Sequence, residues 1–345
     1  MKNLTDEEIL ARLTQDTDVN APLDDDKEFH GSTLLMHVHS VGLVKKLIAM
    51  EADVNATDDD GKTPLLHAFE KNLSDVITAL IKAGADVNIA SEDGKTPLLL
   101  ALRDNNVDVI KALIKAGADV NIEAEDGQTP LLLALKNNNV DIIKSLIKSG
   151  ADVNVANEDG KTPLLLALKE NNWDIVITLI KAGADVNIEN EDGKEPLISA
   201  CENNKWDVVK ALINAGADVN VANEDGKTPL LLAFINEQWT LIKPLIECGA
   251  DVNAVNEDGK TPLIYACEKN RWDIVKALIR AGAEVNVADE EGKTPLMYAC
   301  EKDRLDVVKA FVEAGADINA QNKAGQKALD FSKGHKAQIF LHIKD

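Results

Sequence analysis

The sequence predicts an all-α fold, an α-solenoid of stacked helix-turn-helix repeats with short β-hairpin fingers. Glycines recur at a period of 33 residues from Gly61 to Gly325, and each period holds two apolar stripes at helical spacing. Because such short helices are not stable alone, each repeat must bury its apolar faces against both neighbours, which builds a solenoid.

Each repeat begins with a finger. In the repeat of Gly160, the Asp159-Gly160 dipeptide lies between short extended runs. Asp-Gly is typical of a tight hairpin in which both central residues have positive φ. The sequence therefore predicts a hairpin with positive φ at both Asp159 and Gly160.

A first helix follows the finger. Thr162 is suited to cap its N-terminus through the side-chain oxygen, and Pro163 fits the first helical turn, where an N–H group is not needed. Asn171 is expected to end this helix, because asparagine tolerates the left-handed conformation. The apolar face consists of Leu164, Ala167 and Leu168.

The second helix is predicted from a second apolar stripe. Gly183 is expected to close this helix as a C-terminal cap, and Asp185-Val186-Asn187 leads into the next finger. The stripe consists of Trp173, Val176, Ile177 and Ile180.

The repeats divide the chain into three parts. Residues 1–30 are predicted to form a capping helix with a connecting loop, and Thr5 to Glu8 fits a capping box. Residues 31–324 hold nine repeats, of which the first is three residues shorter than the others. Residues 325–345 are predicted to form a closing repeat.

Composition and charge exclude several classes of function. The formal net charge is −22, which argues against nucleic acid as a partner, because binding to phosphates depends on Lys and Arg. The acidity fits either solubility of the molecule or a basic partner. The first residues do not resemble a signal peptide and no stretch has transmembrane length, so we expect a cytoplasmic protein that does not bind membranes.

The repeated motifs resemble those of a known family. The G-x-T-P-L-x-x-A opening and the G-A-D-V-N close, at a period of 33 residues, are similar to ankyrin repeats. The resemblance covers nearly the whole chain. It implies a module without enzymatic activity that binds a protein or peptide on its concave surface, through the hairpin tips and the exposed face of the first helices. We expect a monomer without a cofactor.

Several positions depart from the family pattern. Leucine, isoleucine or methionine stands where the family usually has histidine, at Leu66, Leu99, Leu132, Leu165, Ile198, Leu231, Ile264 and Met297. Buried aliphatic side chains there favour stability. Glu51 replaces a capping glycine, and Glu195 replaces the threonine that starts a first helix. Pro244 falls inside a second helix, which it should bend or loosen.

Positions that vary between repeats are the best candidates for contact with a partner. On the first-helix face we predict that contacts involve Lys169, Glu170, Glu202, Asn203, Ile235, Asn236, Tyr265, Glu268, Lys269 and Tyr298. At the hairpin tips we predict that they involve Glu191, Asp192, Glu224, Asp225, Glu257 and Asp258. The expected centre is the region of the irregular repeat that contains Pro244. A rigid spacer without a specific ligand, natural or engineered, is the alternative.

Other side chains have two interpretations each. A tryptophan occurs at one position of successive repeats, as a packing element or as an aromatic contact strip: Trp173, Trp206, Trp239 and Trp272. His37 and His67 occupy equivalent places, yet no acidic or cysteine pattern completes a zinc site. Cys201, Cys267 and Cys300 replace apolar residues and are expected to be buried. We predict neither catalytic nor metal-binding residues.

Overall fold

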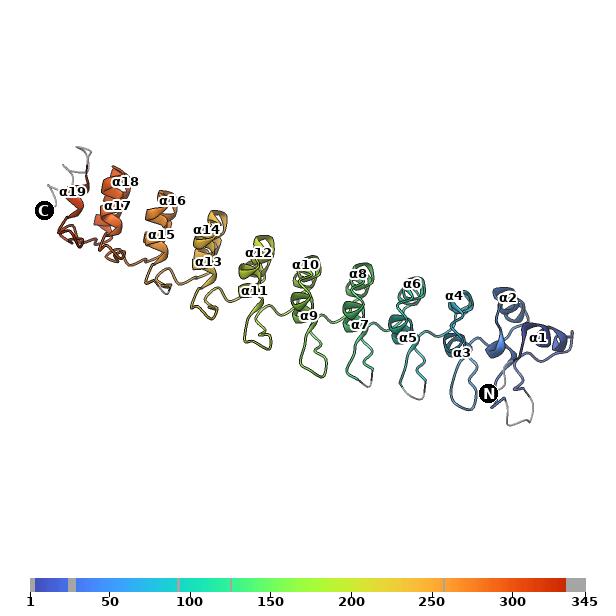
Figure 1. The fold of residues 1–345 in the computed structure, drawn as a ribbon. Coiled ribbons are helices and arrows are strands. Elements are labelled where there is room, and N and C mark those ends of the chain that lie inside the picture. The colour runs from blue at the N-terminus through green and yellow to red at the C-terminus, as the bar shows by residue number, and fades with distance from the viewer. Residues whose placement is uncertain (1–3, 24–28, 92–93, 125, 257, 333–345) are drawn as a thin grey trace. The chain divides into compact units, whose positions relative to one another are not determined.

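The computed structural model describes residues 4–23, 29–91, 94–124, 126–256 and 258–332 (Figure 1). Within these residues all regular elements are helices, and none is a strand. The chain forms two compact units, an N-terminal unit from Met1 to Ala184 and a C-terminal unit from Asp185 to Asp345. Each unit is a stack of helix pairs, as the sequence predicts.

The N-terminal unit begins with α1 (Asp6–Arg12), whose Thr5 and Glu8 form the predicted capping box. Five pairs of a first and a second helix follow. They are η1 (Leu34–His37) with α2 (Val41–Ala49), α3 (Pro64–Glu70) with α4 (Ser74–Lys82), α5 (Pro97–Arg103) with α6 (Val107–Lys115), α7 (Pro130–Lys136) with α8 (Val140–Lys148), and α9 (Pro163–Lys169) with α10 (Trp173–Lys181).

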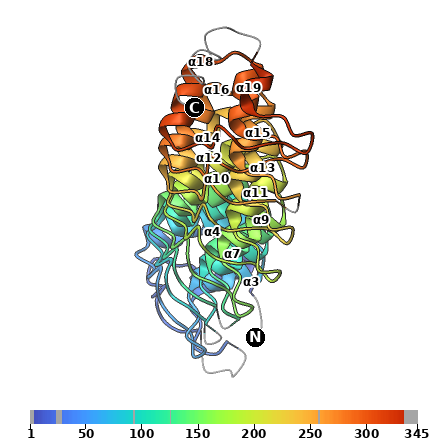
Figure 2. The ribbon, with the colours of Figure 1, turned by 90° about the vertical axis from the view of Figure 1, so that its left-hand side faces the viewer.

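In its described residues, the C-terminal unit contains four such pairs, followed by α19 (Ala328–Phe331). Figure 2 shows the first helices α11, α13 and α15 on one side of this unit and the second helices on the other. The pairs are α11 (Pro196–Glu202) with α12 (Trp206–Asn214), α13 (Pro229–Ile235) with α14 (Trp239–Glu247), α15 (Pro262–Glu268) with α16 (Trp272–Arg280), and α17 (Pro295–Glu301) with α18 (Leu305–Glu313). The boundaries of the capping and repeat regions stay a prediction, and residues 333–345 lie outside the described part.

The predicted helix ends are confirmed. Leu165 N–H donates to Thr162 Oγ1 at 3.4 Å, and Pro163 occupies the first turn of α9. Asn171 has φ of 54° and Gly183 has φ of 89°, so both adopt the left-handed conformation that stops a helix.

The fingers differ from the predicted hairpin. Gly160 N–H donates to Asn157 O at 2.8 Å, and Asn157 N–H donates to Lys161 O at 3.1 Å. Gly160 has φ of 73°, whereas Asp159 is not among the residues with positive φ. The prediction of two positive φ values was therefore wrong. A three-residue loop with one left-handed glycine closes the finger through a bulge, so only the glycine needs conformational freedom.

The buried stripe of the second helix is also wider than predicted. In α10, Val176 and Ile180 are buried as expected, but Trp173 and Ile177 are only half-buried. The other buried residues are Ile175 and Leu179. Because α10 packs against α9 and α8 at once, its buried arc spans more than one face.

The aliphatic residues at the family's histidine position are buried, except Leu165, which is half-buried. Pro244 lies inside α14 without ending it. Near its start, α14 has a short bond from Leu241 N–H to Gln238 O at 3.0 Å. The equivalent short bonds occur in α16 and α18, which contain no proline, from Ile274 N–H to Arg271 O at 3.0 Å and from Val307 N–H to Arg304 O at 2.9 Å. The bending or loosening of α14 expected from Pro244 stays a prediction.

Asparagines tie successive repeats together. In the C-terminal unit, Asn220 Oδ1 accepts from Asp251 N–H at 2.7 Å, and Asn220 Nδ2 donates to Gly249 O at 3.1 Å. Asn121 makes the same two bonds, to Asp152 and Gly150, in the N-terminal unit. These bonds satisfy backbone groups that a loop would otherwise leave to water.

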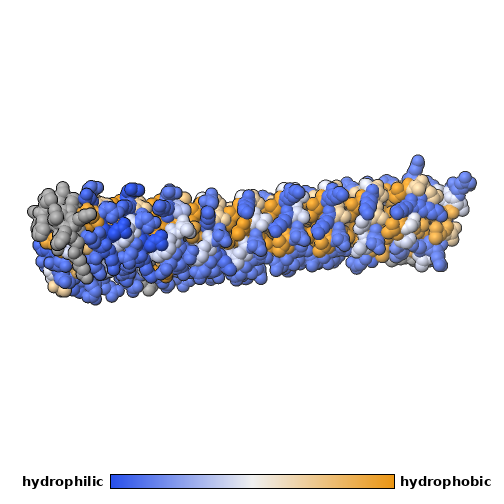
Figure 3. Space-filling view, turned by 90° about the horizontal axis from the view of Figure 1, so that it is seen from above, coloured by the Kyte–Doolittle hydropathy of each residue, from blue (hydrophilic) through white to orange (hydrophobic). Residues whose placement is uncertain are grey.

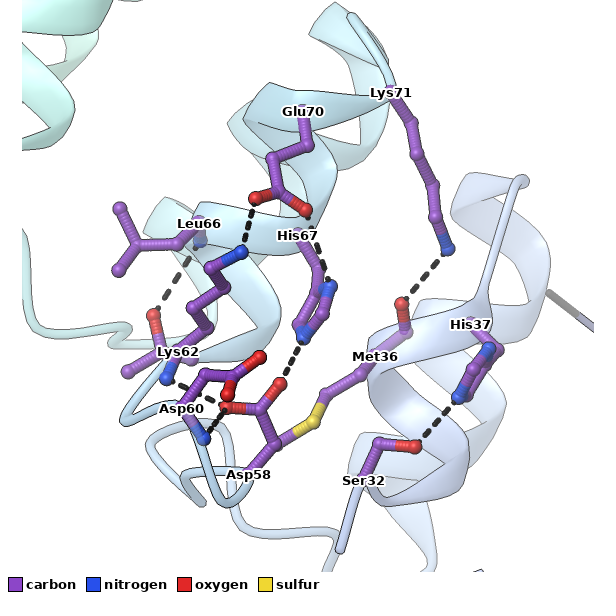
Figure 4. A network of polar contacts seen from close by, with 11 residues as sticks. Ser32, Met36, His37, Asp58, Asp60, Lys62, Leu66, His67, Glu70 and Lys71 are labelled. Carbon is purple, nitrogen blue, oxygen red and sulfur yellow. Dashed lines mark hydrogen bonds and ion pairs between the residues drawn. The ribbon is translucent and has the colours of Figure 1, made fainter. Parts of the chain in front are cut away.

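The N-terminal end holds a buried polar network (Figure 4). His67 Nε2 lies 2.8 Å from Asp58 Oδ2, and both side chains are buried. Leu4 N–H donates to His37 Nδ1, so the proton of neutral His37 is on Nε2, which donates to Ser32 Oγ at 2.8 Å. This histidine therefore helps to fix the chain that leads into α1.

Candidate protein-binding surface

Most of the predicted helix-face residues lie at the ends of first helices or in the turns that follow, whereas Tyr265 and Tyr298 lie in the middle of α15 and α17. Lys169 and Glu170 belong to the N-terminal unit and are exposed. The remaining eight belong to the C-terminal unit, where Asn236, Tyr265, Glu268 and Tyr298 are half-buried and the others exposed. We call these eight residues, with the described tip residues Glu191, Asp192, Glu224, Asp225 and Asp258, the first-helix face.

Lysines at the finger bases pair with the carboxylates at the ends of first helices. Lys194 Nζ lies 3.2 Å from Glu202, and Lys260 Nζ lies 3.0 Å from Glu268. The hydrogen bonds that these lysines donate to the carboxylates raise the pKa of both lysines. Lys62 and Glu70 form the same pair in the N-terminal unit, at 2.6 Å. The predicted residues Glu202 and Glu268 are thus already neutralised in part.

Ile235 interrupts this pattern at the end of α13. The other first α-helices, from α3 to α17, end in a charged residue, namely Glu70, Arg103, Lys136, Lys169, Glu202, Glu268 and Glu301. Lys227, the finger lysine of the same repeat, pairs with Asp225 of its own finger at 2.9 Å. Ile235 is 41% exposed.

The two tyrosines are held by the bases of their own fingers. Asn256 Nδ2 lies 3.1 Å from the Tyr265 hydroxyl, and the Tyr298 hydroxyl donates to Asp289 at 2.7 Å. Burial raises the pKa of both phenols, and the hydrogen bond to Asp289 raises that of Tyr298 further. Neither phenol is thereby suited to act as an acid or base near neutral pH.

Asn203 and Asn236 cap their own helices. Asn203 Nδ2 donates to Ser199 O at 2.8 Å, and Asn236 Nδ2 donates to Leu232 O at 2.9 Å. Lys269 reaches back to the preceding repeat and pairs with Glu237 at 2.7 Å. The predicted contact set includes Lys269 but not its partner Glu237.

The tips of the C-terminal fingers are acidic and exposed. The described members of the predicted set are exposed: Glu191, Asp192, Glu224, Asp225 and Asp258. The side chain of Glu224 is 84% exposed. Glu257 lies outside the described residues. These carboxylates are accessible to a molecule that approaches the fingers.

In the N-terminal unit, Glu170 borders a hollow between α7 and α9 with a volume of about 380 Å³. Leu135 and Leu166 line it, and Lys136 lies on its rim. The second-helix face looks different: Figure 3 shows bands of hydrophobic residues between hydrophilic ridges. A hollow of about 750 Å³ lies there between α2 and α4.

The tryptophans serve at least in part as packing elements. Trp272 is 7% exposed, and the other three are half-buried. Arg271 lies 4.7 Å over the Trp239 ring, and Arg304 lies 5.7 Å over the Trp272 ring. Each of these two rings is thus covered by an arginine of the next repeat, which stabilises the stack.

Three cysteines of the C-terminal unit lie in its core. Cys201, Cys267 and Cys300 are buried as predicted, and burial raises the pKa of each thiol. Over the described ranges, no group of three or more potential ligands is placed to hold a metal ion. None of the described helices combines the length and apolar character needed to cross a membrane.

The comparison with protein families agrees with this architecture. A model of three ankyrin repeats matches residues 34–124, 98–190, 179–256 and 235–322. Among curated proteins, none matches the chain in sequence. The family matches extend over most of both units and coincide with the helix pairs described above. The chain therefore belongs to the ankyrin repeat family.

Proposed function

We propose that this protein is a non-enzymatic scaffold or adaptor that binds a protein or peptide on the first-helix face of its C-terminal unit. Ankyrin repeats are generally protein–protein interaction modules. The observation that carries the proposal is the contrast between constant and variable positions. Capping and core positions repeat nearly unchanged, whereas the ends of the first helices carry Glu202, Ile235 and Glu268 in succession.

The chemistry of this surface favours a partner with positive charge. The tips present exposed carboxylates, and the finger lysines are held by carboxylates of the same chain. A basic partner would gain favourable long-range attraction, whereas the phosphates of nucleic acid would be repelled. We further propose that the protein acts in the cytoplasm as a monomer.

The test is capture of partners from a cell lysate, followed by mass spectrometry. One variant carries alanine at Asn203, Ile235 and Lys269 on the first-helix face. A matched control carries alanine at the exposed second-helix residues Asp207, Lys210 and Lys243. Partners should be lost from the first variant and retained by the control.

A rigid spacer is the second candidate, favoured by the near identity of the repeats. A spacer predicts the same captured proteins for the wild type and both variants. That result would contradict the proposed adaptor function. Equal loss from both variants would show that the contact surface is not specific to the first helices.

A further inference from the structure

We infer that the first-helix face takes a basic peptide segment that presents one aliphatic or aromatic side chain to Ile235. This inference rests on the proposed function and names the chemistry of its partner. In the described part of the C-terminal unit, the large hydrophobic residues that are exposed are Ile235, at 41%, and Val255, at 53%. Ile235 is the last residue of α13, and Val255 lies in the finger of the next repeat, before α15.

An aromatic cluster is centred on the residue that precedes Ile235. The preceding residue, Phe234, is 1% exposed, and its ring stacks on Tyr265 with centroids 6.3 Å apart. The ring of Trp239 meets the Phe234 ring edge-on, with centroids 5.9 Å apart. Because Phe234 and Tyr265 are fixed by packing and by the Asn256 bond, an apolar side chain docking here would bury surface at little cost in conformational entropy.

The repeat geometry also indicates which finger residues lie beside Ile235. Asn223 donates to Glu202 at 3.0 Å, and Glu202 is the residue equivalent to Ile235 one repeat earlier. The equivalent of Asn223 one repeat later is Asn256, which follows Val255. The pattern therefore brings the Val255–Asn256 finger to the end of α13.

Carboxylates surround this apolar position. Glu202 and Glu268 occupy the same place on the two flanking first helices, and Glu224 and Asp225 lie on the finger of the Ile235 repeat. The nearby lysines are matched: Lys260 pairs with Glu268, Lys227 with Asp225, and Lys269 with Glu237. Glu224 and Glu202 share a single lysine, Lys194, at 3.8 and 3.2 Å, so one negative charge exceeds these pairs. Lysine or arginine on both sides of the apolar residue would complement this arrangement.

The same repeat breaks further local rules. Glu237 has φ of 55°, at a turn position where the other second helices from α4 onward are preceded by asparagine or aspartate, residues that adopt this conformation more readily. Pro244 lies inside α14. Departures of this kind concentrate at functional sites, where local stability is given up for another property.

A peptide selection tests this inference. A random peptide library displayed on phage is selected on the immobilised full-length protein, and enriched peptides are synthesised. Dissociation constants are then measured for the wild type and Ile235→Glu. This variant restores the residue type found at positions 202 and 268, so it should fold and give Lys227 a second carboxylate.

We expect enriched peptides to carry a large apolar residue flanked by lysine or arginine. They should bind I235E about tenfold or more weakly than the wild type. The control variant K136E places glutamate at the equivalent position of α7, and the peptides should bind it as tightly as the wild type. Higher ionic strength should weaken binding. Thermal denaturation of I235E at or above the wild-type temperature would show that the loss is not unfolding.

Acidic peptides, peptides without an apolar residue, or equal binding to I235E would overturn the inference. If such peptides still lose affinity for the triple alanine variant of the first-helix face, the proposed function stands and only this partner chemistry fails. If no peptide is enriched, or none is affected by either variant, both proposals fail together.

Discussion

Replacing Glu195 with threonine should stabilise the C-terminal unit. Glu195 occupies the N-cap of α11 but makes no side-chain capping bond, and its Oε2 atom is buried without a hydrogen-bond partner among the residues that the structure describes. At the equivalent place in α13, Thr228 Oγ1 accepts from Leu231 N–H at 3.4 Å. Threonine at position 195 would offer the same bond to Ile198 N–H.

Two contributions set the expected magnitude. A threonine N-cap is worth about 1 kcal/mol, and relief of an unsatisfied buried polar atom is worth about 1 to 3 kcal/mol. Since Glu195 is half-buried, the lower end applies to the second contribution, and the sum is about 2 kcal/mol. Hydrogen exchange at the Ile198 amide should then slow by roughly 30-fold.

The effect should depend on pH. Burial, followed by the nearby Asp218 and Glu189, raises the pKa of the Glu195 carboxyl above its ordinary value of 4.5. The folded state therefore holds this proton more tightly than the unfolded state. The part of the destabilisation that comes from the ionised Glu195 carboxylate is complete above the raised pKa and disappears as the pH falls below 4.5, whereas the missing N-cap bond remains. The advantage of E195T should shrink over the same interval.

The control is the opposite exchange, Thr228→Glu in α13, which should speed exchange at the Leu231 amide. The reasoning is refuted if E195T leaves exchange at Ile198 unchanged at pH 7, or if its effect grows in acid. Chemical denaturation of the whole chain is less suited to the test, because repeat arrays can unfold in parts.

Three other changes can be checked in the same way. Burial, and then the charge of Lys71, lowers the pKa of His37 from 6.5 to about 4. The contribution of neutral His37 to the stability of the fold is therefore complete above pH 6.5, and about 3 kcal/mol of it should be lost as the pH falls to 4. Hydrogen exchange at the Leu4 amide should become faster over this interval in the wild type but not in H37Q. Asn220→Ala removes both inter-repeat bonds and should cost about 1 to 2 kcal/mol, seen as faster hydrogen exchange at the Asp251 amide, and unchanged exchange there would contradict the role of the asparagine. Glu237→Asn should stabilise the fold by about 0.5 to 1 kcal/mol and so raise the melting temperature slightly, because relief of backbone strain exceeds the loss of an exposed ion pair. A lower melting temperature would show that the ion pair contributes more than the strain costs.

The repeat architecture follows from local sequence signals, because each helix end depends on a single residue type. Thr162 and Gly183 illustrate this, since cap geometry requires little more than their own conformational preferences. The finger turn was predicted less well, because the Asp-Gly dipeptide fits more than one loop, and only the hydrogen bonds between Asn157 and Lys161 distinguish them.

The surface was harder to predict, because it depends on side chains that meet across space. The lysine and glutamate of each finger pair lie eight residues apart, as in Lys194 and Glu202, and this spacing is visible in the sequence once it is sought. The stacking of Phe234 on Tyr265 joins two repeats, and the bond from Asn256 fixes its geometry. Neither the stacking of Phe234 on Tyr265 nor the bond from Asn256 follows from the periodicity of one repeat.

The asparagine bonds between repeats bear on how such a gene can change. Asn220 reaches Gly249 and Asp251, which lie 29 and 31 residues further along, so each tie spans nearly one period. Loss or duplication of a 33-residue segment would leave each remaining asparagine facing an equivalent glycine and aspartate. The array can therefore shorten or lengthen through recombination, whereas deletion of the Ile235 segment would remove a surface that its neighbours do not encode.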